Sequence, residues 1–481
     1  MSDEIFWMPA RDLAAQIADK TIGVAEVMSA FLQRIEQINP VVNAIVTLRA
    51  EESMATARAM DSNEAQRDGK PLYGMPIAIK DLVPTNGLRT TFGSPIYADF
   101  VPDFDELFVT RLKQAGAIII GKTNTPEFGA GSQTFNQVFG ATRNPYALNR
   151  TCGGSSGGAA SALACGMLPF ADGSDLGGSL RNPASFCNVV GLRPSPGRVP
   201  SWPKQFSSDP FAVAGPMARS VDDLSLLLSI MAGPDARVPI ALPEPGAIFD
   251  GVLPADLRGQ RFAWSADLGF GPVDRQVIAV LEQFLPTIES LGGIVETGQP
   301  DLSDAAEIFN TFRAWTFVER FRDDYAQHRD LMKDTVRWNV EQGEKLSLSD
   351  VSAATKKHSA LIARVATFFE QHDFLVCPAA AVPPFPIEQE WVKSIEGTEM
   401  ATYLDWMAVC WAITVTGCPA ISIPAGFTQE GLPIGVQIVA PRGQDKRLLD
   451  IAHTLERSTQ YGSQRPRLAA SATDAQRKLG L

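Results

Sequence analysis

The chain has 481 residues, of which 45% are hydrophobic and 20% charged, and its formal net charge is -12. This composition is typical of a globular protein with a sizeable core and excludes a disordered or fibrous chain. Asp and Glu outnumber Lys and Arg, 54 to 42, and no basic block stands out. Nucleic acid and anionic membrane surfaces are therefore poor candidate partners, because both attract clustered cations.

The first residues, MSDEIFWMPARDLAAQ, carry acids and Arg where a signal peptide would have its apolar segment. No apolar run approaches the roughly 18 residues that a membrane-spanning helix needs. The six cysteines form no Cys-x-x-Cys pair and stand mostly among apolar residues. We therefore expect a cytoplasmic protein with buried free thiols, no membrane association, no metal and no cofactor.

The hydrophobic pattern changes along the chain. Residues 9–68 repeat apolar side chains at helical spacing, with one helix expected to stop before Pro40. Between 70 and 233, short apolar runs alternate with helix-like stretches, and Ser220 is typical of a helix N-cap. This alternation predicts an α/β fold with a central mixed, mostly parallel twisted sheet that is flanked by helices. The strands expected there are 76–81, 117–124 and 167–175, with helices at 105–115 and 157–165.

The second half of the sequence predicts an inserted helical cap, followed by further strands of the central sheet. Residues 303–373 are charged and almost entirely helical in pattern, so we expect a helical cap region there. Residues 374–460 regain strand character and end in a helix, which completes the sheet. We expect a single large domain over 1–481. The further strands expected are 261–267, about 294, 375–380, 419–426 and 434–441, with helices at 273–291 and 444–457.

Three short patterns match catalytic motifs by letter but conflict with the physics of those motifs. GAIIIGKT at 116–123 fits a phosphate-binding loop, yet its interior reads as a buried strand. Residues 153–157 fit a nucleophile elbow, which requires a histidine, and the four histidines stand in charged helical segments. Ser201 and Lys204 have Ser-x-x-Lys spacing, but Pro203 disrupts the helix. A serine nucleophile here would need a base other than histidine.

Lys80 is the strongest candidate for that base. It ends the apolar run 76–79, so its neighbours are expected to bury it. Desolvation disfavours the charged ammonium and lowers the pKa, which allows a lysine to accept a proton. The alternative is a structural lysine that extends to the surface or pairs with Asp81.

A stretch of small residues at 153–183 carries the second feature. Two Gly/Ser turns flank a helix and an apolar strand, and glycines allow the backbone to approach a ligand closely. Residues 176–179 can present consecutive amides to an oxyanion beside a hydroxyl nucleophile. The alternative is a pair of tight turns, with or without a simple anion-binding nest. Together with Lys80 and the lack of a suitable histidine, the two turns favour catalysis.

These residues resemble the amidase signature family over nearly the whole chain. The family's pattern appears as GGSSGG at 153–158, GSDLGGSLRNP at 173–183 and PIAIKD at 76–81. The resemblance implies hydrolysis of a carboxamide through an acyl-enzyme. It implies Ser179 as nucleophile, and Ser155, preceded by a cis peptide bond, as proton relay to Lys80. It also implies an oxyanion hole from the amides of Leu176, Gly177, Gly178 and Ser179, with support from Asp175, Arg181, Ser156 and Gly154.

The substrate pocket is expected in segments that vary within the family. We expect Gly129, Ala130, Gly131, Ser132, Asn182, Trp315 and Trp338 to contact a small-molecule amide. The aromatic side chains favour an aromatic or otherwise apolar acyl group. A homodimer is a possible assembly.

Three alternatives remain. The same family contains the glutamine-hydrolysing subunit of a tRNA-dependent amidotransferase, which works in a complex. That subunit typically has Gln after the motif's Arg, whereas Asn182 stands here, and the segment 206–217 also differs, so a stand-alone amidase is favoured. Carbamate, ester or hydrazide cleavage could use the same three residues. A catalytically inactive binding protein is disfavoured because all three are present.

Overall fold

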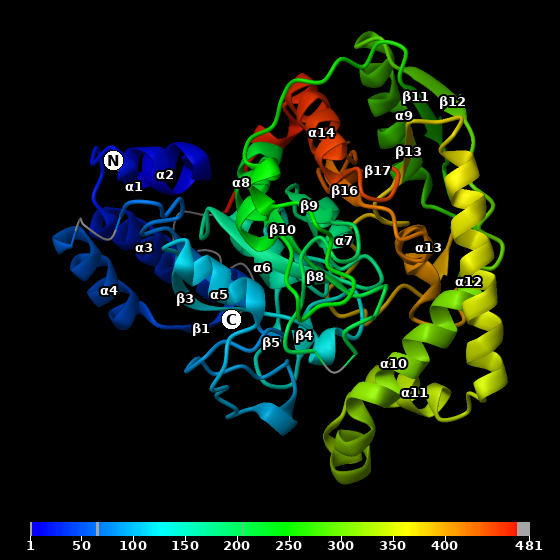
Figure 1. Ribbon diagram of the computed structural model, residues 1–481, viewed down its shortest axis with the longest axis horizontal. Coiled ribbons are helices and arrows are strands. Elements are labelled where there is room, and N and C mark those ends of the chain that lie inside the picture. The colour runs from blue at the N-terminus through cyan, green and yellow to red at the C-terminus, as the bar shows by residue number, and fades with distance from the viewer. Residues whose placement is uncertain (1, 64–66, 205, 469–481) are drawn as a thin grey trace.

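The computed structural model describes residues 2–63, 67–204 and 206–468. The longer strands form two sheets, and helices pack around these sheets (Figure 1). The helices are α1 (Ser2–Trp7), α2 (Ala10–Ala18), α3 (Val24–Val42), α4 (Ala50–Ser62), α5 (Leu107–Gln114), α6 (Gly157–Ala164), α7 (Arg181–Phe186), α8 (Val221–Met231), α9 (Arg275–Ser290), α10 (Ala305–His328), α11 (Asp334–Gly343), α12 (Leu348–Phe368), α13 (Ala408–Thr414) and α14 (Asp445–Thr459).

The larger sheet has eight strands in the order β12-β11-β13-β17-β16-β9-β10-β8. A smaller sheet of three strands has the order β1-β3-β2. The strands of the two sheets are β1 (Ile45–Leu48), β2 (Pro76–Lys80), β3 (Ile118–Thr123), β8 (Phe170–Asp175), β9 (Val190–Arg193), β10 (Val213–Ala218), β11 (Arg261–Trp264), β12 (Ile294–Thr297), β13 (Phe374–Pro378), β16 (Ala420–Phe427) and β17 (Pro433–Val439). Shorter strands are β4 (Phe135–Asn136), β5 (Gly140–Ala141), β6 (Arg143–Asn144), β7 (Ala147–Thr151), β14 (Ser394–Ile395) and β15 (Thr398–Glu399).

The expected mixed sheet is confirmed, but the expectation that it is mostly parallel is wrong for the eight-stranded sheet. Only β11 pairs in parallel, with β12 and β13, whereas the other pairings are antiparallel. The strand–helix–strand unit β8-α7-β9 does occur. However, β10 lies between its two strands and runs antiparallel to both. Alternation along the sequence could not reveal this inserted strand, because a later segment supplies it.

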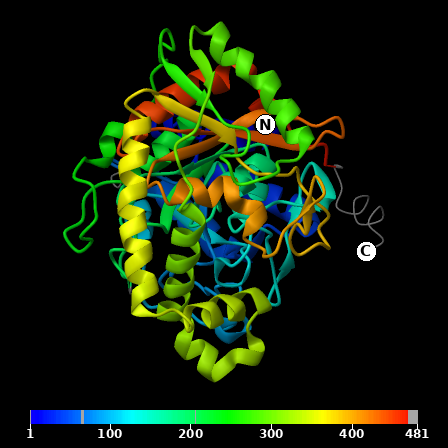
Figure 2. The same cartoon turned by 90° about the vertical axis from the view of Figure 1, so that its right-hand side faces the viewer.

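The helical expectations are largely confirmed. The segment 303–373 forms α10, α11 and α12, which make up one side of the molecule (Figure 2). Ser220 caps α8 by accepting a hydrogen bond from the amide of Asp223. Two details differ in the N-terminal region: α3 continues through Pro40, and β1 interrupts the helices because it pairs with β3. The division of the chain into one domain with the expected boundaries stays a prediction.

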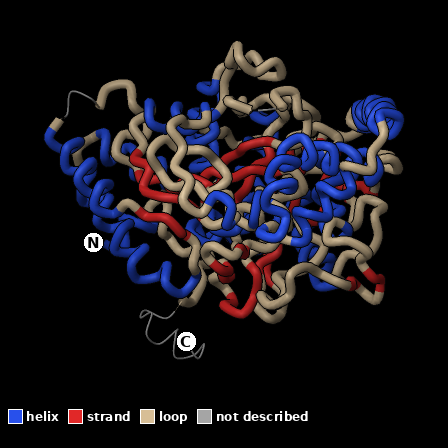
Figure 3. The backbone as a smooth tube through the Cα atoms, turned by 90° about the horizontal axis from the view of Figure 1, so that it is seen from below, coloured by secondary structure: helices blue, strands red, loops and turns tan. Residues whose placement is uncertain are grey.

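Apolar side chains fill the space between the sheets and their covering helices. In Figure 3 the long strands run through the middle of the molecule, with helices on either side of them, whereas some short strands lie at its edge. Every residue of β2, β13 and β17 is buried, as expected for strands covered on both faces. All six cysteines are buried and unpaired. None of the helices that the structure describes combines the length and apolar character needed to cross a lipid bilayer.

The close approach of α6 to β3 positions the first Gly/Ser turn. A Cβ atom on Gly158 would lie 2.3 Å from the amide nitrogen of Asn124, just after β3. A Cβ atom on Gly157 would lie 2.3 Å from the Thr134 hydroxyl. Only glycine therefore allows α6 to begin this close to the backbone behind it, and this contact fixes where Ser155 and Ser156 lie.

We predict that Gly158→Ala lowers the free energy of unfolding by about 1–3 kcal/mol, because the added methyl group overpacks the contact with Asn124. Urea denaturation followed by circular dichroism would measure this. Gly298→Ala is the matched control, since its Cβ would have no neighbour closer than 3.9 Å. Equal stability of the two variants would contradict the packing constraint.

Candidate active site

Lys80 lies at the end of β2 with its amino group surrounded by three serine hydroxyls. Its Nζ donates hydrogen bonds to Ser155 Oγ at 2.8 Å, Ser156 Oγ at 2.8 Å and Ser174 Oγ at 3.0 Å. The side chain has no exposed area. The Lys80 backbone amide donates to Asp172 Oδ1 at 2.9 Å, which joins β2 of the small sheet to β8 of the large one. The structure thus buries the one lysine that the sequence singled out.

Burial lowers the pKa of Lys80 from 10.5 to about 7, although the negative charges of Asp172 and Asp175 oppose that shift. Asp172 is itself fully buried, and burial raises its pKa to about 6. A lysine with a pKa near 7 is partly neutral at physiological pH. It can therefore accept a proton, which an ordinary surface lysine does only rarely.

Two of these contacts were missed by sequence reasoning. Asp172 and Ser174 occupy alternate positions on β8, so the strand's period of two directs both toward β2. Ser174 also belongs to the Gly-Ser-Asp part of the second motif. The alternation could have suggested a shared face, but only the packing of β2 on β8 shows that Lys80 is their common partner.

The two Gly/Ser turns meet at the same place. The Ser156 amide donates to the Ser179 carbonyl at 3.3 Å. The peptide bond between Gly154 and Ser155 is cis. The side chains of Ser155 and Ser179 are nearly buried, with exposed fractions of 3% and 8%, and both line one cavity. Two hydroxyls from distant parts of the sequence therefore face a common space next to Lys80.

Asp175 and Arg181 form a buried ion pair below the second turn. Arg181 donates to both carboxylate oxygens, from Nη2 at 2.8 Å and from Nε at 3.0 Å. Burial alone would raise the pKa of Asp175, but the charges of Arg181 and Arg193 hold it well below its usual range. Asp175 is therefore a permanent carboxylate, and its lone pairs are available to order the loop that follows.

The carboxylate of Asp175 organises the backbone amides of that loop. It accepts the amide hydrogens of Gly178 and Leu180, each at 3.0 Å. The amide of Gly178, which the sequence placed in the oxyanion hole, therefore already has an acceptor in the structure described. The amides of Leu176, Gly177 and Ser179 have no hydrogen-bond acceptor among the described residues. These three N–H groups are the ones that could hold an oxyanion.

Ser155 and Ser179 line a cavity of about 580 Å³. Gly129, Gly131 and Ser132, which the sequence placed in the pocket, line it as well. Much of the remaining wall is aromatic, and α10 contributes one side through Arg313, Thr316, Phe317 and Arg320 at helical spacing. The aromatic lining consists of Phe92, Tyr97, Phe100, Phe104, Phe128, Phe206 and Phe317.

Four other residues expected in the pocket do not line this cavity. Ala130 is fully buried behind its neighbours, and Asn182 is occupied in holding the amide of Gly154 and the hydroxyl of Ser132. Trp338 packs edge-on against Tyr403. Trp315 packs against Phe206 and Phe312. It lies on α10, but not on the side of the helix that lines the cavity. The rotation of a helix about its axis decides which of its aromatic residues face the cavity, and composition does not reveal that rotation.

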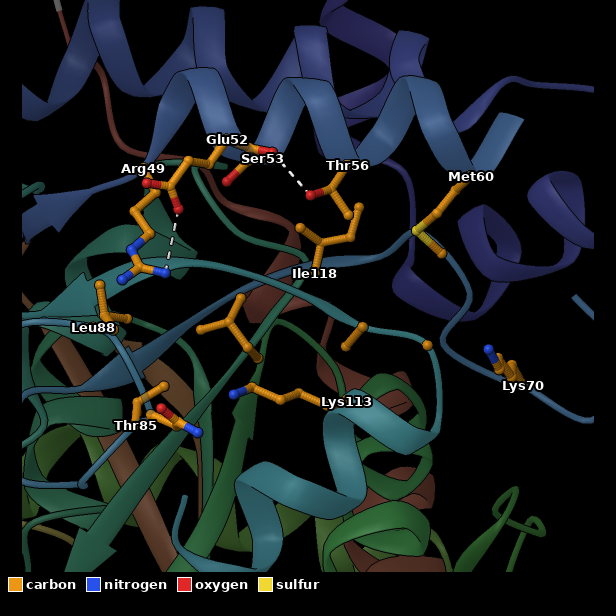
Figure 4. Close-up of a pocket in the computed structure, with 14 residues that line it drawn as sticks. Arg49, Glu52, Ser53, Thr56, Met60, Lys70, Thr85, Leu88, Lys113 and Ile118 are labelled. Carbon is orange, nitrogen blue, oxygen red and sulfur yellow. Dashed lines mark hydrogen bonds and ion pairs between the residues drawn. The ribbon is translucent and has the colours of Figure 1, made fainter. Parts of the chain in front are cut away.

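A second cavity of about 370 Å³ lies between α4, β3 and α5 (Figure 4). Arg49, Ser53 and Thr56 come from the α4 side, and Lys113 and Ile118 lie opposite them in the close-up. None of the residues expected to act in catalysis lines it. The four histidines also line neither this cavity nor the one at Ser179. The candidate catalytic residues are therefore Lys80 and the serines near it.

Comparisons with known proteins identify the family of this chain. The family model described as Amidase matches residues 26–449. An acylamidase of Rhodococcus erythropolis is 34% identical over 471 residues, which cover 96% of this chain and 98% of the relative. A glutamyl-tRNA(Gln) amidotransferase subunit of Moorella thermoacetica is 32% identical, covering 97% of this chain and 100% of its own.

A comparison with solved structures points to the same family. The solved structure of a bacterial aryl acylamidase belonging to the amidase signature enzymes superimposes with a TM-score of 0.88 at 27% identity, covering 95% of this chain and 98% of the other. The expected mixed α/β fold is thus shared with that enzyme. The chain belongs to the amidase signature family and is an amide-hydrolysing enzyme.

Proposed function

We propose that the protein is a stand-alone amidase that cleaves a small carboxamide through an acyl-enzyme formed on Ser179. The observation that carries this proposal is the buried Lys80 amino group, 2.8 Å from Ser155 Oγ, next to the cavity that Ser179 faces. A buried amine with a lowered pKa, a relay hydroxyl and a second hydroxyl facing a cavity are the parts that serine nucleophile activation needs.

In the first half-reaction, Ser179 Oγ attacks the amide carbon, and its proton passes to Ser155 as Ser155 gives its own proton to neutral Lys80. The amides of Leu176, Gly177 and Ser179 would stabilise the oxyanion. Protonated Lys80 then returns the proton through Ser155 to the leaving nitrogen, because an amine leaves poorly unless it is protonated. Water releases the acyl group by the same relay, which yields a carboxylate and restores Ser179.

The hydroxyls around Lys80 explain how its lone pair is directed. A neutral amine has two hydrogens and one lone pair. Ser156 Oγ donates to the Ser174 carbonyl at 3.4 Å, so its own lone pairs can accept from Lys80. If Ser156 and Ser174 accept the two hydrogens, the lone pair points to Ser155. Ser156 and Ser174 would thus act as positioning residues for the base.

The aromatic cavity walls support an apolar or aromatic part in the acyl group. The relatives named acylamidase and aryl acylamidase support cleavage of an acyl amide, without specifying its acyl group. A second candidate is a glutamine-hydrolysing component of a larger complex, because the Moorella amidotransferase protein is nearly as similar as the acylamidase. That candidate requires a partner, whereas the stand-alone amidase works alone. A carbamate or ester hydrolase would use the same relay on a different carbonyl.

Substitutions in the relay should abolish turnover. We expect Ser179→Ala and Lys80→Met each to lower kcat/KM on simple aryl and alkyl amides by at least about a thousandfold, because each removes a group that the relay requires. Ammonia release by the purified chain measures this.

Ser161→Ala is the matched control, since Ser161 lies on α6 and donates to the Arg143 carbonyl, away from the relay. Full activity of Ser179→Ala would contradict the proposal. Turnover that appears only with a co-purified partner would favour the amidotransferase candidate.

The pH dependence should follow Lys80. Because only neutral Lys80 accepts a proton, kcat/KM should rise about tenfold per pH unit below 7 and level off above it. Asp172→Asn should shift this midpoint to lower pH, because the charge of Asp172 favours the protonated lysine. Initial rates between pH 5 and 10 measure both profiles. A wild-type profile that is flat across pH 7 would exclude Lys80 as the base.

A further inference from the structure

Arg313 is a buried cation without an anionic partner among the residues that the structure describes. It lies on α10, lines the same cavity as Ser155 and Ser179, and has an exposed fraction of 5%. Its guanidinium donates to Asn339 Oδ1 at 3.0 Å and to the Tyr403 hydroxyl at 2.6 Å, and both acceptors are neutral. It also stacks over the Phe317 ring, with its Cζ 4.6 Å from the ring centre.

The other buried arginines of the described chain are ion-paired. Arg181 and Arg193 pair with Asp175, and Arg198 pairs with Asp445. Within residues 2–63, 67–204 and 206–468, no carboxylate lies within ion-pair distance of Arg313, and its Nη1 has no acceptor. Because a buried charge is costly unless it is paired, such a residue normally finds an anion. For Arg313 the missing anion would have to come from a ligand.

The acidic groups of the cavity do not supply it. Asp175 is held by Arg181, and Asp209 pairs with Lys204 at 3.3 Å. Glu106 is partly buried, and burial raises its pKa to about 7, so it is only partly charged at neutral pH. Arg320 lines the cavity two turns further along α10. This wall of the cavity therefore favours a negative group.

Arg313 stands close to the groups proposed to hold the scissile carbonyl. A Cβ atom on Gly177 would lie 3.4 Å from the Phe309 ring, so Phe309 brings α10 into contact with the loop of residues 176–179, which carries the proposed oxyanion-binding amides. Arg313 follows one turn later on the same helix, an axial rise of about 6 Å. A short acyl chain that starts at Gly177 and runs along α10 would therefore reach the guanidinium.

We propose that the preferred substrate carries a carboxylate at the far end of its acyl group, and that Arg313 binds this carboxylate. The substrate class is then a monoamide of a dicarboxylic acid, or a related amide with a short apolar spacer against the aromatic wall. The planar guanidinium, held at its Nε side by Asn339 and Tyr403, keeps Nη1 for the ligand and suits a carboxylate. This inference rests on the proposed function.

The test compares glutaramate with pentanamide, which has a methyl group in place of the carboxylate. For the wild-type enzyme we expect kcat/KM to be at least about tenfold higher for glutaramate, because a charge-assisted hydrogen bond is lost in the neutral analogue. Arg313→Gln should lower this ratio at least about tenfold. Arg322→Gln, an exposed position on the same helix, is the control and should leave the ratio unchanged.

The outcomes separate this inference from the proposed function. If the wild-type enzyme hydrolyses pentanamide as well as glutaramate, the inference is overturned while the amidase proposal stands. If neither amide is hydrolysed, calorimetric titration of both into Ser179→Ala decides: tighter binding of glutaramate supports the carboxylate site, and equal or absent binding overturns it. The wild-type comparison needs no substitution at Arg313, so a misfolded variant cannot obscure the result.

Discussion

The desolvation of Lys80 is the constraint on which the rest of the site depends. An amine that is removed from water loses its preference for the charged form, and burial at the end of β2 brings its pKa to about 7. This requires β2 and β8, which belong to different sheets, to lie side by side, and the hydrogen bond from the Lys80 amide to Asp172 joins them. The surrounding serines satisfy the amine without giving it a full counter-charge.

A second constraint acts on the loop that contains Ser179. The carboxylate of Asp175 lies between Arg181 and Arg193, which keep it ionised, and it accepts two amide hydrogens of the loop. The remaining amides line the cavity and find no acceptor in the described part of the chain. The site thus has two distinct electrostatic parts: a strongly paired carboxylate that shapes the backbone, and a weakly compensated amine that can exchange a proton. Both are buried, but only the second can titrate near neutral pH.

Local motifs predicted the parts of the site that short sequences encode. Lys80, Ser155 and Ser179 stand in Gly/Ser turns or at the end of an apolar run, and the structure brings them together. Ser174 and Asp172 were missed because their role depends on which strand packs against β8. Trp315 and Trp338 do not line the cavity, because the rotation of α10 and α11 about their axes comes from tertiary packing. Arg313 resembled any charged residue of a helical segment, and only its burial without a carboxylate from the described residues distinguishes it.

Because local patterns do not encode tertiary packing, the strand directions in the large sheet were also not predictable. The strands were found from their apolar runs, but their directions depend on where β10 inserts, which no local pattern encodes.

The central claim, that Lys80 is a base with a lowered pKa, is tested most directly by observing the residue itself. Titration of the ¹³Cε resonance of Lys80 by NMR, assigned with Lys80→Met, should show a midpoint near pH 7. A midpoint above pH 10 would contradict the account.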